Sequence, residues 1–138
     1  MDNISKSYKT EEFYNKFKEQ VSSSLIRHKS ILDIMTKMDE YNARVNRALA
    51  KSVTTCGCIS IHAEKQNFDG EIFGDLSKQV KSHLHGHLCE NCKDVVEEEI
   101  GNYLFYLTSL CNTLDLNLHD ILMKEYERNK LLGIYSLK

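Results

Sequence analysis

The chain has 138 residues, with 18 lysines and arginines against 20 aspartates and glutamates, six glycines and no proline. Charges of both signs are interspersed, which excludes the basic surface that a nucleic-acid partner requires. Because proline and glycine, the residues that punctuate strands and tight turns, are so rare, long helices are favoured and we expect an all-α protein. The length suits one domain, residues 1–138, with a core of its own.

No stretch of the sequence approaches the roughly 20 consecutive apolar residues that cross a bilayer. The opening residues "MDNISKSYKTEEFYNKF" also lack the apolar centre of a secretion signal. We therefore expect a cytoplasmic protein with no membrane partner. Thiols stay reduced in that compartment, so the five cysteines favour metal binding, redox chemistry or simple burial over a disulfide framework.

The N-terminal half predicts two amphipathic helices. Between Thr10 and Leu25 the apolar residues recur every four positions, at Phe13, Phe17, Val21 and Leu25. Ser30 is a suitable N-cap for a second helix. The apolar stripe of that helix extends over about seven turns, at Ile31, Met35, Met38, Val45, Leu49, Val53 and Cys56. Residues 66–77 contain asparagine, aspartate and glycine and should form a loop.

The C-terminal half predicts a short helix from Asp75 to Leu84 and two longer ones. The first long helix begins near Cys89 or Asp94 and ends near Asp115, with an apolar face of Val96, Ile100, Tyr103, Leu107, Leu110, Cys111 and Leu114. Asn117 can cap a last helix through Leu132. Four main helices with one apolar face each predict a four-helix-bundle-like arrangement. Two of the stripes exceed what a monomer readily covers, so we expect a homodimer, with a monomer as the alternative.

Polar residues also fall on or beside these apolar faces. Helical geometry places Glu99 at the edge of the face and Asn102 one step further out, while Glu98 points nearly away. Asn42 falls inside the stripe of the second helix, where an amide without a partner would cost roughly 1 to 3 kcal/mol. We therefore expect Glu99 and Asn102 on a neighbouring helix to satisfy Asn42. The alternative is that the "EEE" of residues 97–99 is a solvated helix start favoured by the helix dipole.

Residues 97–130, "EEEIGNYLFYLTSLCNTLDLNLHDILMKEYERNK", resemble the C-terminal half of the MazG-like nucleotide pyrophosphohydrolases. In that family a helix bearing Glu-x-x-Asp precedes an "LLFYL"-type apolar run, and a short turn leads into a last helix with a basic tail similar to "ERNK". The resemblance implies an all-α, usually dimeric MazG-type fold that holds magnesium between carboxylates of two helices. It also implies cleavage of nucleoside triphosphates to monophosphate and pyrophosphate.

Carried over residue by residue, Glu99 matches the first position of Glu-x-x-Asp, with Glu98 beside it, but Asn102 stands where the aspartate belongs. The family's other helix bears Glu-x-x-Glu, and the matching "KMDEYNARVNRAL" offers Asp39 and Glu40 without a second carboxylate at that spacing. Magnesium sites use carboxylates together with waters and phosphate oxygens. We therefore expect a degenerate or weak pyrophosphohydrolase or, alternatively, a non-catalytic, zinc-stabilised helical binding or regulatory module.

Two close pairs of cysteines favour a metal site: Cys56-Gly57-Cys58 and Cys89-x-x-Cys92. Tetrahedral zinc sites commonly combine two such short clips. On a continuous helix the sulfurs of the first pair would point about 200° apart. Both can therefore bind only if the helix ends there, which Gly57 permits. If the helix continues instead, Cys58 and His62 share a face, and His62 becomes the alternative ligand.

Other readings of the cysteines and histidines stay open. Cys111 lies in the middle of an apolar stripe and is predicted to be a small buried side chain. The paired cysteines could likewise be buried thiols or a redox pair. His83, His85 and His87 alternate, so in an extended segment they would share one side and could supply a spare ligand. Exposure to solvent is the alternative for these three histidines.

Overall fold

The computed structural model describes residues 2–69 and 78–133, with side chains from residue 9 onward. The elements in chain order are α1 (Asp2–Ser24), α2 (Ile31–Lys51), the π-helical turn η1 (Ser52–Cys56), β1 (Ile59–Ile61), β2 (Leu84–Gly86), α4 (Glu90–Thr113) and α5 (Leu118–Leu132). Helices dominate this part of the chain, and its strands form one small two-stranded sheet. The prediction of a helical protein is therefore confirmed.

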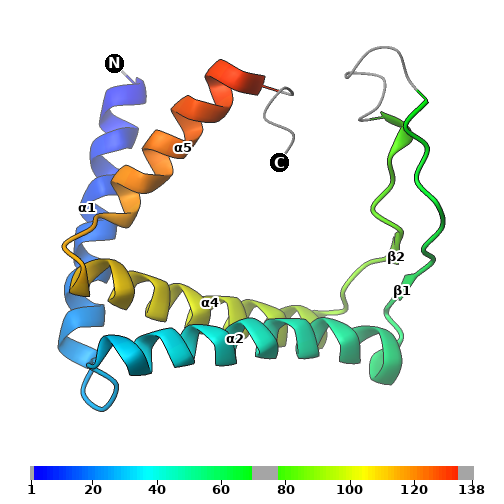
Figure 1. Ribbon diagram of the computed structural model, residues 1–138, viewed down its shortest axis with the longest axis horizontal. Coiled ribbons are helices and arrows are strands. Elements are labelled where there is room, and N and C mark those ends of the chain that lie inside the picture. Colours follow the sequence, from blue (N-terminus) through cyan, green and yellow to red (C-terminus); the bar gives the residue numbers. More distant parts are fainter. Residues whose placement is uncertain (1, 70–77, 134–138) are drawn as a thin grey trace.

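Helices α2 and α4 lie side by side and antiparallel and form the centre of the molecule (Figure 1). Ile34 of α2 is fully buried, and Val96 of α4 is buried as well. Further along, the rings of Tyr41 and Tyr106 stack with their centroids 5.4 Å apart. This seam places the end of α2 beside the start of α4, where the four paired cysteines lie.

The buried side of α2 differs from the predicted stripe. Met35 and Leu49 were expected inside but are exposed, whereas Ile34 and Ser52 are buried. Asn42 is exposed too, so water can satisfy its amide and the expectation that Glu99 and Asn102 do so is wrong. The physical reason is that α2 carries two adjacent apolar stripes, and only the neighbouring helix decides which one is covered.

Helix α1 packs against the other end of the α2–α4 pair. Its Val21 is fully buried, and the Asn112 amide donates hydrogen bonds to the Lys18 carbonyl oxygen at 3.2 Å and to Ser22 Oγ at 2.9 Å. The N–H of Leu118 donates to Tyr14 Oη at 2.9 Å, which fixes the start of α5. Phe13, expected on the apolar face, is exposed.

The helices do not close into one compact bundle within the described chain. Helices α1 and α5 project from one end of the α2–α4 pair, and the β1–β2 arm projects from the other end on the same side (Figure 1). No residue of α5 is buried. The predicted bundle-like arrangement is thus seen only as an open framework with a helix pair at its centre.

The helix boundaries follow the predicted caps closely. Ser30 Oγ accepts a hydrogen bond from the Leu32 N–H, and Asn117 Oδ1 accepts one from the Asp120 N–H at 3.0 Å. Cys89 caps α4, whose helical residues begin at Glu90. These short polar side chains meet backbone N–H groups that have no partner within the first helical turn, which is why their positions are predictable.

The segment between the helices differs from the prediction. Of the expected helix from Asp75 to Leu84, residues 75–77 lie outside the described ranges, only residues 78 and 79 are helical, and Leu84–Gly86 forms strand β2. This strand pairs antiparallel with β1, with Ile59 opposite Gly86, Ser60 opposite His85 and Ile61 opposite Leu84. Residues 66–69 contain no regular element, as expected for a loop, and residues 70–77 are not described.

None of the helices in residues 2–69 and 78–133 combines the length and the apolar character that a bilayer crossing requires.

Replacing Gly86 by alanine should damage the arm. Gly86 has a φ of +87°, and a Cβ there would lie 2.5 Å from the Cys58 carbonyl oxygen. Backbone strain of this kind costs about 1 to 3 kcal/mol, so we expect Gly86→Ala to lower the melting temperature in a thermal denaturation experiment.

Gly101→Ala is the matched control for this substitution. Gly101 lies within α4, and nothing is within 4 Å of an added Cβ. Alanine is favoured over glycine inside helices by about 1 kcal/mol, so this variant should be as stable as the parent or more so. Equal melting temperatures for Gly86→Ala and the parent would contradict the structure of the arm.

Candidate metal centre

The structure brings the four paired cysteines together at the junction of three elements. Cys56 ends η1, Cys58 precedes β1, Cys89 caps α4, and Cys92 lies in the first turn of α4. Their Sγ atoms all lie within 4.8 Å of one another, and those of Cys56 and Cys89 are 3.8 Å apart. Zinc with bonds of about 2.3 Å to sulfur has its tetrahedral ligands about 3.8 Å apart. The four thiols can therefore hold a metal ion such as zinc.

Gly57 makes this arrangement possible by ending the helix. Its φ of +79° is left-handed, and its N–H donates to the Ser52 carbonyl oxygen at 2.9 Å. The chain turns out of the helix there, so Cys56 and Cys58 approach the same point instead of opposite sides of a helix. Of the two geometries left open by the sequence, the structure shows the one in which the helix ends at Gly57.

His62 is not part of the thiol cluster. Strand β1 begins at Ile59, so Cys58 and His62 do not share a helical face. The Nε2 atom of His62 instead lies 3.2 Å from Ser60 Oγ, and its ring meets that of His85 at a centroid distance of 4.8 Å. The alternative ligand set that included His62 is therefore not assembled.

The four thiols perturb one another. The N–H of Cys92 donates to Cys89 Sγ and, together with the Cys92 and Cys56 thiols, lowers the pKa of Cys89 to about 7. A hydrogen bond with Ser52 acts to lower the pKa of Cys92, but the hydrogen bond with Cys89 and burial outweigh it and raise that pKa to about 12. Four thiolates this close would repel one another strongly. A divalent cation removes that repulsion, so metal binding must release protons.

Cys111 is separate from this cluster. It is buried within α4, and burial raises the pKa of its thiol. Its predicted role as a small buried side chain is confirmed. It also provides a cysteine that can be changed without touching the candidate metal centre.

A second region of interest is the groove that contains the candidate carboxylates of the sequence resemblance. This groove, which we call the α2–α4 groove, has a volume of 470 Å³ and is lined by Glu40, Ala43, Arg44, Arg47, Ala48, Lys51, Val95 and Glu99. Glu40 of α2 and Glu99 of α4 thus line the same groove. Asp39 and Glu98 are exposed, Asn102 is half-buried, and none of these three lines the groove.

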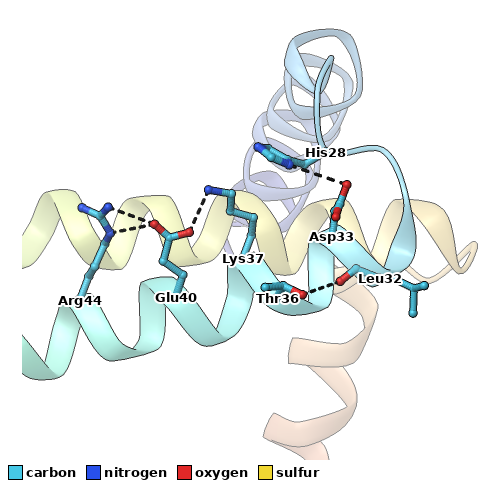
Figure 2. Close-up of polar contacts among 7 residues, drawn as sticks. All are labelled: His28, Leu32, Asp33, Thr36, Lys37, Glu40 and Arg44. Atoms are coloured by element: carbon cyan, nitrogen blue, oxygen red, sulfur yellow. Dashed lines mark hydrogen bonds and ion pairs between the residues drawn. The ribbon is translucent and has the colours of Figure 1, made fainter.

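Glu40 is already neutralised by cations of its own helix (Figure 2). Lys37 Nζ donates to it at 2.8 Å, and Arg44 donates through Nε at 3.2 Å and through a terminal nitrogen at 3.0 Å. The hydrogen bonds from Lys37 and Arg44 hold the pKa of Glu40 below its usual value. The same contacts raise the pKa values of Lys37 and Arg44. Glu40 is therefore a partner for cations of the protein and not a free metal ligand.

The remaining charges of the groove also disfavour magnesium. Glu99 has a buried carboxylate oxygen with no hydrogen-bond partner in residues 2–69 and 78–133. Over the same residues, no carboxylate lies within ion-pair distance of Arg47 or Lys51. A divalent cation needs several carboxylates, waters or phosphates around it. This groove offers one carboxylate outside an ion pair, Glu99, beside three basic side chains. The residues present do not fit a magnesium site.

The basic side of the groove was not among the features predicted from the sequence. The signal was available, because Arg44, Arg47 and Lys51 are spaced three and four residues apart and therefore share one side of α2. A magnesium site is indicated by carboxylates alone, so the prediction of such a site did not include these basic residues. Comparison of the chain with models of known protein families, with curated proteins and with solved structures found no match.

Proposed function

We propose that the chain is a non-catalytic, zinc-stabilised helical binding module with a MazG-like fold. The observation that carries the proposal is the cluster of four cysteine Sγ atoms within 4.8 Å of one another. Four thiolates complete the tetrahedral shell of zinc and leave no position for water or substrate, as is typical of structural and not catalytic zinc sites. The MazG-like fold is supported by the resemblance of residues 97–130 and by α4 and α5, which end and begin where that resemblance places a turn.

Zinc would fix the β1–β2 arm to the α2–α4 pair. The cluster joins the end of η1 to the first turn of α4, across the base of the β1–β2 arm. Each strand of the arm has only three residues, and two-stranded ribbons of this size are marginal in water. A structural metal commonly supplies folding energy to such small units. The metal therefore fixes the arm relative to α2 and α4.

Elemental analysis tests this proposal directly. Protein purified without added metal should contain one zinc per chain, Cys89→Ser should lose it, and Cys111→Ser, which changes a buried thiol outside the cluster, should retain it. Because zinc binding must displace protons from the thiols, zinc affinity should fall as the pH is lowered. Less than about a tenth of an equivalent in the parent protein would refute the zinc site.

We also propose that this module forms a homodimer. The chain exposes 10887 Å², whereas a compact monomer of 16.0 kDa exposes about 7,400 Å². Even in fully extended form, the residues outside the described ranges would account for only about 2,300 Å² of the difference. The remainder, more than about 1,000 Å² per chain, matches the area that each subunit buries in an obligate homodimer.

The exposed apolar side of the α2–α4 pair is the surface that a second copy would cover. Leu49 is exposed on α2, and Ile100 and Leu104 are exposed one turn apart on α4. Leu49 also lines an apolar pocket of 770 Å³ with Ile59, Ile61, Leu84, Leu88 and Val96 at the base of the arm. The basic α2–α4 groove lies on the opposite side of the seam, lined by Val95. Covering the apolar side would therefore leave the groove open.

Sedimentation equilibrium should give twice the 16.0 kDa mass of one chain for the parent protein. Leu104→Asp should dissociate the dimer, because it places a charge in the apolar interface. Val95→Asp is the matched control, since both side chains are 43% exposed on the same helix but lie on opposite sides of it. A monomeric parent protein, or equal effects of the two variants, would contradict this interface.

A weak nucleotide pyrophosphohydrolase is the second candidate function. The observation in its favour is that Glu40 and Glu99, from the two helices that the resemblance implies, line one groove. Against it stand the ion pairs of Glu40 with Lys37 and Arg44, and the asparagine at position 102.

Magnesium-dependent release of pyrophosphate from a panel of nucleoside triphosphates should therefore be negligible. The decisive comparison is between Glu99→Gln, which changes the groove, and Glu98→Gln, which changes an exposed neighbour outside it. Robust turnover in the parent protein that survives Glu98→Gln but disappears in Glu99→Gln would establish the enzyme and overturn the module.

A further inference from the structure

The β1–β2 arm gathers histidines at a place separate from the thiol cluster. Ser60 pairs with His85 across the ladder, and the N–H of His62 donates to the His83 carbonyl oxygen at 2.9 Å, which extends the pairing by one step. Directly opposite and alternate residues of an antiparallel pair place their side chains on the same face. Ser60, His62 and His85 therefore share one face of the arm.

The imidazoles on this face are close to one another. The rings of His62 and His85 meet edge to face with their centroids 4.8 Å apart. A cleft of 660 Å³ is lined by both histidines and by Glu64, Lys81, Ser82 and His83. Lys81 Nζ pairs with the Glu64 carboxylate at 3.2 Å. The charges of Lys81 and Glu64 thus offset each other. The imidazoles are then the metal-binding groups that line the cleft without a charged partner.

His83 has two unfavourable features that nothing in the described protein relieves. Its φ of +60° lies in the left-handed region, which residues with a side chain rarely adopt. Its Nε2 atom is buried and has no hydrogen-bond partner in residues 2–69 and 78–133. Strained backbone and unsatisfied buried polar atoms recur at ligand sites, because the ligand supplies the missing interaction. Both features occur in a residue that lines the histidine cleft.

We infer that His62, His83 and His85 bind a divalent transition-metal ion such as zinc or nickel. Imidazole nitrogen suits these ions, and three histidines are a common ligand set that leaves further positions for water. A hydrogen bond between Ser60 Oγ and one ring nitrogen of His62 orients the ring and leaves its other nitrogen available for the metal. The metal would also give the buried His83 Nε2 the partner it lacks.

The histidine site is less preorganised than the thiol cluster. In the described chain the cysteines are the ligands that already lie within 4.8 Å of one another. The histidine nitrogens do not lie this close together, so His62 and His85 must rotate about their side-chain bonds to reach an ion at His83 Nε2. The histidine site therefore binds more weakly and exchanges its metal, whereas the thiol cluster keeps its metal.

Calorimetric titration of the zinc-containing protein with nickel tests the inference. One further equivalent of nickel should bind, without the near-ultraviolet absorption of nickel held by thiolates. His62→Gln and His85→Gln should each weaken binding by at least about tenfold. His87→Gln is the matched control, because His87 follows the same strand but lines the apolar pocket and not the histidine cleft. Retention of zinc by each variant shows that the thiol cluster at the base of the arm is intact.

Absence of a second equivalent, or equal binding by the parent and both glutamine variants, would overturn the histidine site. So would thiolate absorption accompanied by release of zinc, since nickel would then occupy the cysteines. The site does not depend on the proposed function. If the purified protein contains no zinc, that proposal fails, while the same titration still tests the histidines because thiolate and imidazole complexes differ in absorption.

Discussion

The seam between α2 and α4 is the interaction on which the other features of this protein depend. Two antiparallel helices held together by Ile34, Val96 and the stacked Tyr41 and Tyr106 bring the end of one beside the start of the other. Cysteines more than 30 positions apart in the sequence meet for this reason. The same seam has a basic groove on one side and an apolar surface on the other, so it also separates two surfaces of different chemistry.

Features set by a few neighbouring residues could be predicted from the sequence. The caps at Ser30 and Asn117 follow from local backbone chemistry, and the spacing of the cysteines predicted two clips of one metal site. The sequence left open whether the helix ends at Gly57, as it does in the structure. The stripe of α2 that is buried could not be predicted, since two adjacent stripes have similar apolar character and the choice is made by α4. The three-residue strands are too short to leave a periodic signal. Asn42 was predicted to be buried because the wrong stripe of α2 was expected to face the neighbouring helix.

The two proposed metal sites illustrate different relations between a metal and a fold. The thiol cluster sits where helices and arm join, its ligands converge before any ion arrives, and a filled shell leaves no room for other chemistry. The histidine cleft lies out on the arm, where few neighbours restrain its side chains and water can complete the coordination. The first would hold the arm in place, and the second would use the arm as a surface open to solvent.

The π-helical turn η1 adds a constraint of chain length. A π-helical turn accommodates one residue more than an α-helical turn, and one residue corresponds to about 100° of helical rotation. Cys56 therefore points toward α4 only because Ser52–Cys56 contains this extra residue. Removing any one of residues 52–55 would turn Cys56 away while leaving every cysteine in the sequence. The spacing between the end of α2 and Gly57 is thus as much a part of the metal centre as the sulfur atoms themselves.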